Sequence, residues 1–119
     1  MSTEPYIEGK TTIAPEVLLT IARLATLKTP GVSKLSPVPP NSVPLLGKRG
    51  HVGEGVAIEI VDDVFYADLY VILRSDINVR EISHNLQHEV ARAISEMVGM
   101  QVGRVNIHIE DIDFTEIEA

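Results

Sequence analysis

The sequence predicts an α+β fold, a two-layer sandwich in which two helices cover one face of a small mixed β-sheet. Three observations support this prediction: an apolar helical segment near the start, a hairpin in the middle, and an amphipathic helix before a final strand. Elements in the order β-α-(β)-β-β-α-β suit such a sandwich, because both helices can bury their apolar sides against one sheet face. A chain of 119 residues also has the size of one domain, which we expect to span residues 1–119.

The first strand is expected at residues 6–13, where β-branched residues are frequent, and the first helix from Pro15 to about Lys28. Proline suits the first position of a helix because its missing N–H would have no intrahelical partner there. A narrow polar stripe interrupts the otherwise apolar helix, at Glu16, Thr20 and Arg23 with Thr26 beside it. A helix this apolar is expected to be deeply buried or to contact a second subunit as well.

A β-hairpin is expected in the middle of the chain, after a short strand at Val32–Leu35. Its strands, 56–61 and 64–74, flank Asp62 and Asp63, and a two-residue acidic turn between such strands is typical of a hairpin. Alternate side chains of the second hairpin strand are apolar and are predicted to face the core: Phe65, Ala67, Leu69, Val71 and Leu73.

The second helix has the clearest signals at its two ends. Asn78 is a favourable N-cap, Glu81 can return the hydrogen bond as in a capping box, and Gly99 suits the left-handed position after the C-terminus. Apolar residues recur between them at helical spacing: Val79, Ile82, Leu86, Val90, Ala93, Ile94 and Met97. A final strand is expected at 102–109 or slightly beyond, followed by an acidic tail at 110–119 that we expect to fray.

Composition and charge exclude several classes of function. The chain has a formal net charge of −7, no cysteine and no tryptophan. An acidic protein of this kind is not expected to bind nucleic acid, and without cysteine it can hold no disulfide, thiol nucleophile or thiolate metal site. The charge is uneven, +5 over residues 10–53 and −10 over 54–119, which either marks an interaction surface or is mixed by folding.

Signals for export or membrane insertion are not found in this sequence. The N-terminal residues do not have the pattern of a signal peptide. The longest apolar-rich run, 17–27, is much shorter than the ~20 residues that a membrane-spanning helix needs. The sequence therefore predicts a cytoplasmic protein without direct membrane insertion, which would reach a membrane only through a partner.

The candidate metal and phosphate motifs are incomplete. His84 and His88 have the spacing of a zinc-binding helix, but Asn85 stands where a hydrolytic site needs glutamate, and no third ligand is nearby in sequence. The glycine-rich segment 47–53 lacks the spacing of a phosphate-binding loop, and no helix follows it. No motif of a nucleophilic enzyme is present either. We therefore predict no catalytic residue, no metal ligand and no cofactor.

A long loop expected at residues 36–55 contains the candidate partner-binding residues. It has four prolines, four glycines and no apolar periodicity, and loops of this length are usually functional or disordered. Lys48 and Arg49 can hold an anionic group or simply be solvated, whereas Leu45 and Leu46 can anchor a partner or fold back onto the core. We predict these four residues as the partner-binding set.

Several segments form an ordered set that extends over residues 7–114, apart from the loop at 37–54. They begin with GKTTIAPEV at 9–17, IA at 21–22 and TPGV at 29–32, and continue at 55–60, 67–71, 82–97, 99–100 and 105–112. This set resembles the alkaline shock protein family, the bacterial envelope stress response proteins. Because the loop departs from the family pattern, the resemblance does not imply that this chain shares a partner that family members bind through the loop.

The resemblance implies a small cytoplasmic bacterial protein with a role in cell-envelope homeostasis and no enzymatic activity. Some members of the family lie near the membrane through a separate membrane-anchored protein, which implies a protein partner of that kind. We predict a non-enzymatic interaction or scaffold protein that forms homo-oligomers. The alternative is a small-molecule or metal-responsive regulatory protein that uses Lys48 and Arg49 or the pair His84 and His88.

Overall fold

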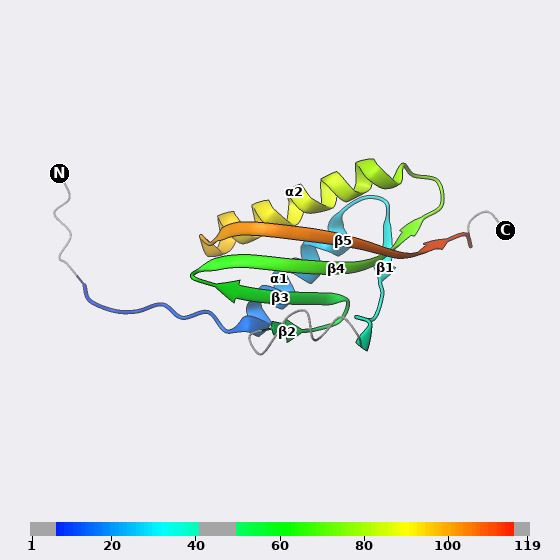
Figure 1. Ribbon diagram of the computed structural model, residues 1–119. Coiled ribbons are helices and arrows are strands. Elements are labelled where there is room, and N and C mark those ends of the chain that lie inside the picture. The colour runs from blue at the N-terminus through cyan, green and yellow to red at the C-terminus, as the bar shows by residue number, and fades with distance from the viewer. Residues whose placement is uncertain (1–6, 41–49, 116–119) are drawn as a thin grey trace, which may run out of the picture.

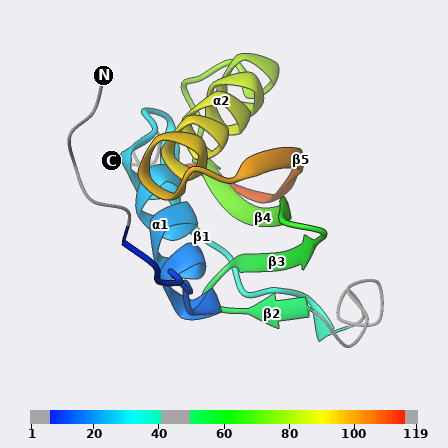
Figure 2. The same cartoon turned by 90° about the vertical axis from the view of Figure 1, so that its left-hand side faces the viewer.

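The computed structural model describes residues 7–40 and 50–115, in which two helices and five strands follow one another along the chain. Their bounds, in chain order, are α1 (Pro15–Lys28), β1 (Val32–Leu35), β2 (Gly50–Val52), β3 (Val56–Val61), β4 (Val64–Arg74), α2 (Val79–Val98) and β5 (Gln101–Asp113). Both helices lie on the same face of the sheet (Figure 2). The predicted two-layer α+β sandwich is therefore confirmed.

The long central strand β4 organises the sheet (Figure 1). Along one edge it pairs in parallel with β5, from Val64 opposite Gln101 to Arg74 opposite Asp113. Along its other edge it pairs antiparallel with β3 and, further along, with β1. β2 extends the sheet by pairing with β3, so β1, β2 and β5 each have one edge that pairs with no described strand. The sheet is mixed, as predicted.

The predicted hairpin of β3 and β4 forms in the expected register. Val61 pairs with Val64, so Asp62 and Asp63 make a two-residue turn, with φ of 51° and 63°. Two consecutive positive φ values are the conformation of a type I′ turn, which matches the twist of the flanking strands. The five residues of β4 that were predicted to face the core are all buried.

α2 begins and ends where its capping residues predict. The Glu81 backbone N–H donates a hydrogen bond to Oδ1 of Asn78 at 3.1 Å, and Gly99 has a φ of 79°. The middle of the periodic apolar set is buried against the sheet and α1: Ile82, Leu86, Val90 and Ile94. Its two end members, Val79 and Met97, are instead 39% and 71% exposed, so they do not belong to the core.

Three expectations about the less regular parts of the chain differ from the structure. Residues 7–14, expected to contain a strand, are extended and exposed, because no described sheet edge lies beside them to accept their backbone hydrogen bonds. The stretch 36–55, expected to be a loop, contains β2, which forms because it pairs with β3. β5 continues into the expected acidic tail as far as Asp113, because β4 is long enough to pair with it there.

Candidate interaction surface

One side of α1 presents apolar side chains to solvent. Val17, Leu24 and Leu27 are 46%, 45% and 43% exposed. They lie on one side of the helix, away from the buried Leu18 and Ala22, because their spacing follows the helical repeat. We call these three residues the α1 stripe. Apolar side chains gathered on a surface commonly mark a site of interaction with another protein.

Of the predicted polar stripe of α1, Glu16 and Thr20 are exposed and Arg23 is half-buried, but Thr26 is buried, as is Thr29 just after the helix. Thr26 is fully buried, and its hydroxyl donates to the Ala22 carbonyl oxygen at 2.8 Å. The hydroxyl of Thr29, just after the helix, donates to the Ala25 carbonyl oxygen at 2.9 Å. Bonds to the carbonyl four residues earlier satisfy a hydroxyl locally, so threonine can be buried without another partner. The helix therefore buries Thr26 and exposes the α1 stripe.

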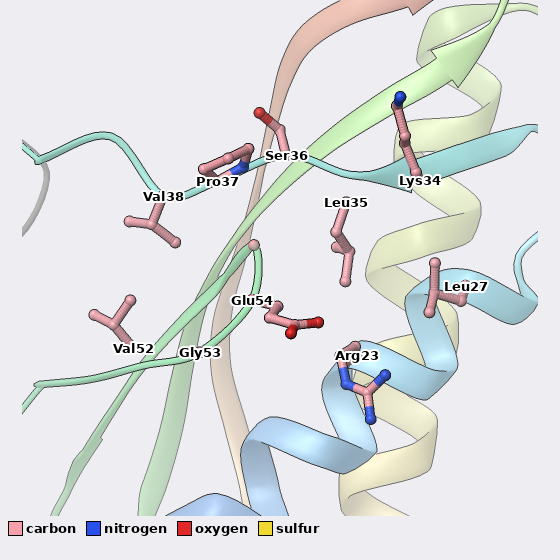
Figure 3. Close-up of a pocket in the computed structure, with 11 residues that line it drawn as sticks. Arg23, Leu27, Lys34, Leu35, Ser36, Pro37, Val38, Val52, Gly53 and Glu54 are labelled. Carbon is pink, nitrogen blue, oxygen red and sulfur yellow. The ribbon is translucent and has the colours of Figure 1, made fainter.

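A cavity of about 620 Å³ opens beside the C-terminal half of α1 (Figure 3). Its walls come from α1, from β1 and the segment that follows it, and from the end of β2 with the turn into β3. The lining is mainly apolar and includes Leu27, Leu35, Pro37, Val38 and Val52. This volume lies within the range of about 300–1,000 Å³ that small-molecule sites occupy. Because Leu27 belongs to both, the cavity and the α1 stripe form one continuous surface.

Three charged side chains also line this cavity. Figure 3 shows Arg23 of α1 and Glu54 of the turn after β2 on the same side, whereas the Lys34 ammonium group points away from the other lining residues. Within residues 7–40 and 50–115, neither Arg23 nor Lys34 forms an ion pair. An apolar cavity with charges of both signs at its margin suits an amphipathic protein segment better than a free anion.

A polar cluster lies where β4 pairs with β5, on the sheet face opposite the helices. Oδ1 of Asp68 accepts a hydrogen bond from Nδ2 of Asn106 at 3.1 Å and lies 2.8 Å from Nε2 of His108. The His108 ring stacks on Tyr70, with ring centroids 4.5 Å apart and ring planes 10° apart. Asp68 is opposite Asn106 and Tyr70 is opposite His108 in the parallel register. The cluster therefore joins the edge strand to the central strand.

This cluster of polar side chains was not predicted from the sequence. Asp68 and His108 are 40 residues apart, and they meet only because β5 pairs in parallel with β4. Each strand has alternate residues that face outward, Asp68 and Tyr70 in β4 and Asn106 and His108 in β5. This pattern was visible in the sequence, but only the pairing of β4 with β5 shows that the two sets meet. In the described residues the hydrogen-bond partner of His108 is Asp68, and no hydroxyl or thiol forms a hydrogen bond with its ring.

The other sequence-predicted site residues have different outcomes. Leu45, Leu46, Lys48 and Arg49 lie outside the residues that the structure describes. His84 and His88 are both exposed on α2. In the described ranges, no three histidine or acidic side chains come together as metal ligands. Across the same ranges, neither helix is long and apolar enough to cross a membrane.

Comparison with known proteins gives a family over nearly the whole chain. Residues 3–114 match the model of the alkaline shock protein 23 family, which is described as having a cell envelope-related function. The chain is 29% identical to YqhY of Bacillus subtilis over 107 residues, which are 89% of this chain and 78% of YqhY. It is 34% identical to Spy1535 of Streptococcus pyogenes over 113 residues, which are 94% of this chain and 84% of Spy1535.

Solved structures with a similar fold include the MamM-CTD fragment 215–293. Its TM-score is 0.51 at 14% identity, and the match covers 82% of this chain and 99% of that fragment. A MamM-CTD histidine-to-alanine variant gives a TM-score of 0.52 at the same identity, over 84% of this chain. At this level of identity the likeness concerns the fold alone.

Proposed function

The chain belongs to the alkaline shock protein 23 family, whose function is described as cell envelope-related, and from this premise we propose that it is a non-enzymatic scaffold that binds protein partners. We place it in the cytoplasm, where it acts in cell-envelope homeostasis. Its proposed partners are further copies of itself and a membrane-anchored protein, which would hold it near the membrane.

The observation that supports this proposal is the α1 stripe beside the apolar cavity. Three large apolar side chains that are each almost half exposed can be covered by a partner at little cost in desolvation of polar groups. Covering the exposed half of one such side chain contributes about 1 kcal/mol to binding. A partner that also fills the cavity next to Leu27 gains further buried area.

The four loop residues remain a second proposed contact. Leu45, Leu46, Lys48 and Arg49 directly precede β2 in the chain, and Val52 at the end of β2 lines the cavity. We therefore propose that a partner seated at the cavity also binds these four residues.

The proposal is tested with a tagged full-length chain expressed in its native host, in the presence and absence of the membrane fraction. Leu24→Asp places a charge in the middle of the α1 stripe and should reduce capture of the partners at least about tenfold. Met97→Asp is the matched control, because Met97 is 71% exposed on α2, away from the stripe. Equal capture by wild type, Leu24→Asp and Met97→Asp would remove the α1 stripe as the binding surface.

A second candidate function, a regulator that responds to a small molecule, is favoured only by the cavity. A ligand that binds the folded state alone raises the melting temperature of the protein. We would measure this shift with amphipathic metabolites for wild type and for Val52→Trp, which partly fills the cavity. Divalent metals, tested with the double variant His84→Ala/His88→Ala, examine the metal-responsive alternative. Absence of any shift in both series removes this second candidate.

A further inference from the structure

An extended arm at residues 7–14 precedes α1 and pairs with no strand of the described sheet. Ile7 is 83% exposed and Ile13 is 38% exposed. The arm leaves the start of α1 and runs away from the body of the molecule (Figure 1). In an extended chain, alternate residues point to opposite sides. One side of the arm has an apolar residue at each end, in the series Ile7, Gly9, Thr11 and Ile13, and the other side is polar, with Glu8, Lys10 and Thr12. Such alternation is typical of a half-buried strand, so the arm has the pattern of a strand without a neighbour.

The local backbone directs the arm away from its own sheet. Ala14 is extended, with φ of −64° and ψ of 140°, and it is followed by Pro15. A residue before proline is disfavoured in the helical region, so this junction favours an extended exit from α1. The eight residues of the arm can reach at most about 28 Å, which is enough to cross to a neighbouring molecule.

The sheet edge formed by β5 is poorly suited to accept another strand. The register of β5 shifts twice against β4, which leaves Gly103 and Glu110 as extra residues in the edge strand. The Gln87 side chain also donates a hydrogen bond to the Val105 carbonyl oxygen at 3.1 Å. Bulges and occupied backbone groups are the features by which proteins protect an edge from pairing. The β5 edge is therefore protected.

The edge formed by β2 is short, three residues, but its described residues contain no register shift. It pairs with β3 in an unbroken register from Gly50 to Val52 and contains no acidic residue, lysine or arginine. Val52 is 45% exposed and lines the cavity. The edge also adjoins α1, since a side-chain carbon added at Gly53 would lie 3.5 Å from Cδ1 of Leu19. A strand added here would lie next to both the cavity and the α1 stripe.

We propose that the arm of one copy adds a strand to the free edge of β2 in a second copy, with Ile7 entering the cavity between α1 and the β2–β3 turn. This inference rests on the self-association stated in the proposed function, and it identifies the surface through which two copies bind each other. Reciprocal exchange gives a two-fold dimer in which each arm binds the partner. Main-chain hydrogen bonds then hold the arm, and the cavity recognises its apolar side chain.

The absence of cysteine from the chain allows a direct test of the position of the arm. Full-length Thr11→Cys and a differently tagged His51→Cys chain are co-expressed and treated with a short bismaleimide cross-linker. The proposal predicts a cross-linked heterodimer, which cannot arise within one chain because each chain has one cysteine. Thr11→Cys paired with Gln101→Cys on β5 is the matched control and should give at least about tenfold less product. The proposal is overturned if Thr11→Cys gives no cross-linked product with His51→Cys, or if it gives equal amounts of product with His51→Cys and with Gln101→Cys.

Sedimentation velocity separates this inference from the proposed function. The full-length protein should be a dimer, and Ile7→Asp should raise its dissociation constant at least about tenfold, because burial of an isoleucine is lost. Met97→Asp, on an exposed part of α2, should leave the dimer unchanged. A dimer that persists in Ile7→Asp overturns arm exchange but leaves self-association intact. If the wild-type protein is a monomer at the highest protein concentration measured, arm exchange is overturned and self-association is also removed from the proposed function.

Discussion

The Ser33 hydroxyl donates a hydrogen bond to Oδ2 of Asp113 at 2.7 Å and joins β1 to the end of β5. Oδ1 of the same carboxylate accepts from the Thr115 hydroxyl at 2.7 Å and from the Thr115 backbone N–H at 3.0 Å. The Thr115 hydroxyl first, then Ser33, then the Thr115 N–H lower the pKa of Asp113 from 3.8 to about 2. These hydrogen bonds therefore favour the ionised form of the carboxylate at the end of the last strand.

Stability should fall in acid because of this carboxylate. Its pKa is lower in the folded state, so its contribution is complete above pH 3.8 and is lost as the pH falls towards 2. Ser33→Ala should raise the pKa of Asp113, which a carboxyl ¹³C NMR titration measures. Ser36→Ala is the control, since its hydroxyl makes no contact with Asp113, and it should leave the titration unchanged. An identical titration curve in Ser33→Ala would contradict the assignment.

Removing the shared acceptor of the β4–β5 cluster should destabilise the fold. Asp68→Ala leaves Asn106 and His108 without their partner and should lower the free energy of unfolding by about 1–2 kcal/mol, because the site is partly exposed. Asp68→Asn keeps an acceptor oxygen and should cost less. Urea denaturation measures both, with Glu59→Ala on the neighbouring β3 as a control. A loss in Asp68→Ala no larger than in Glu59→Ala would show that the cluster contributes nothing.

The parts of the fold that could be predicted are those whose ends depend on local chemistry. Pro15 begins α1, Asn78 caps α2, Gly99 ends it, and the acidic turn at Asp62 and Asp63 sets the hairpin register. Each of these signals depends on interactions within a few residues, so it can be recognised from the sequence alone. The alternation in β4 predicted its buried face for the same reason.

The parts that could not be predicted depend on contacts between distant segments. Nothing local to Asp68 indicates that His108 lies 2.8 Å away, because the parallel pairing of β4 and β5 brings them together. The buried side of α1 was also ambiguous, since Thr26 satisfies its own hydroxyl at Ala22 and can face the core. The candidate surface on α1 became visible only when the packing of the helix was known.

Gly55 and Gly99 have similar positive φ values, 69° and 79°, but should respond differently to alanine. A side-chain carbon at Gly55 would lie 2.6 Å from Cβ of Leu35 and 2.8 Å from the Ser36 carbonyl oxygen, whereas at Gly99 it would meet nothing within 4 Å. Gly99→Ala should therefore cost only the positive φ of 79°, about 1 kcal/mol. Gly55→Ala adds steric overlap with backbone and should cost about 2–5 kcal/mol. Equal losses in urea denaturation would mean that the strand junction relaxes around the new side chain.

The hairpin turn should be open to stabilisation. Asp63 has a φ of 63° as the second residue of a type I′ turn, a conformation that costs a residue with a side chain roughly 1–2 kcal/mol. Asp63→Gly removes that cost but gives the unfolded chain more freedom, so a net gain of about 0.5–1 kcal/mol in the free energy of unfolding is expected. Asp63→Ala is the matched control and should not stabilise, because alanine also disfavours positive φ. Thermal denaturation compares the three proteins, and a lower melting temperature for Asp63→Gly than for wild type would show that the aspartate makes a compensating interaction in the turn.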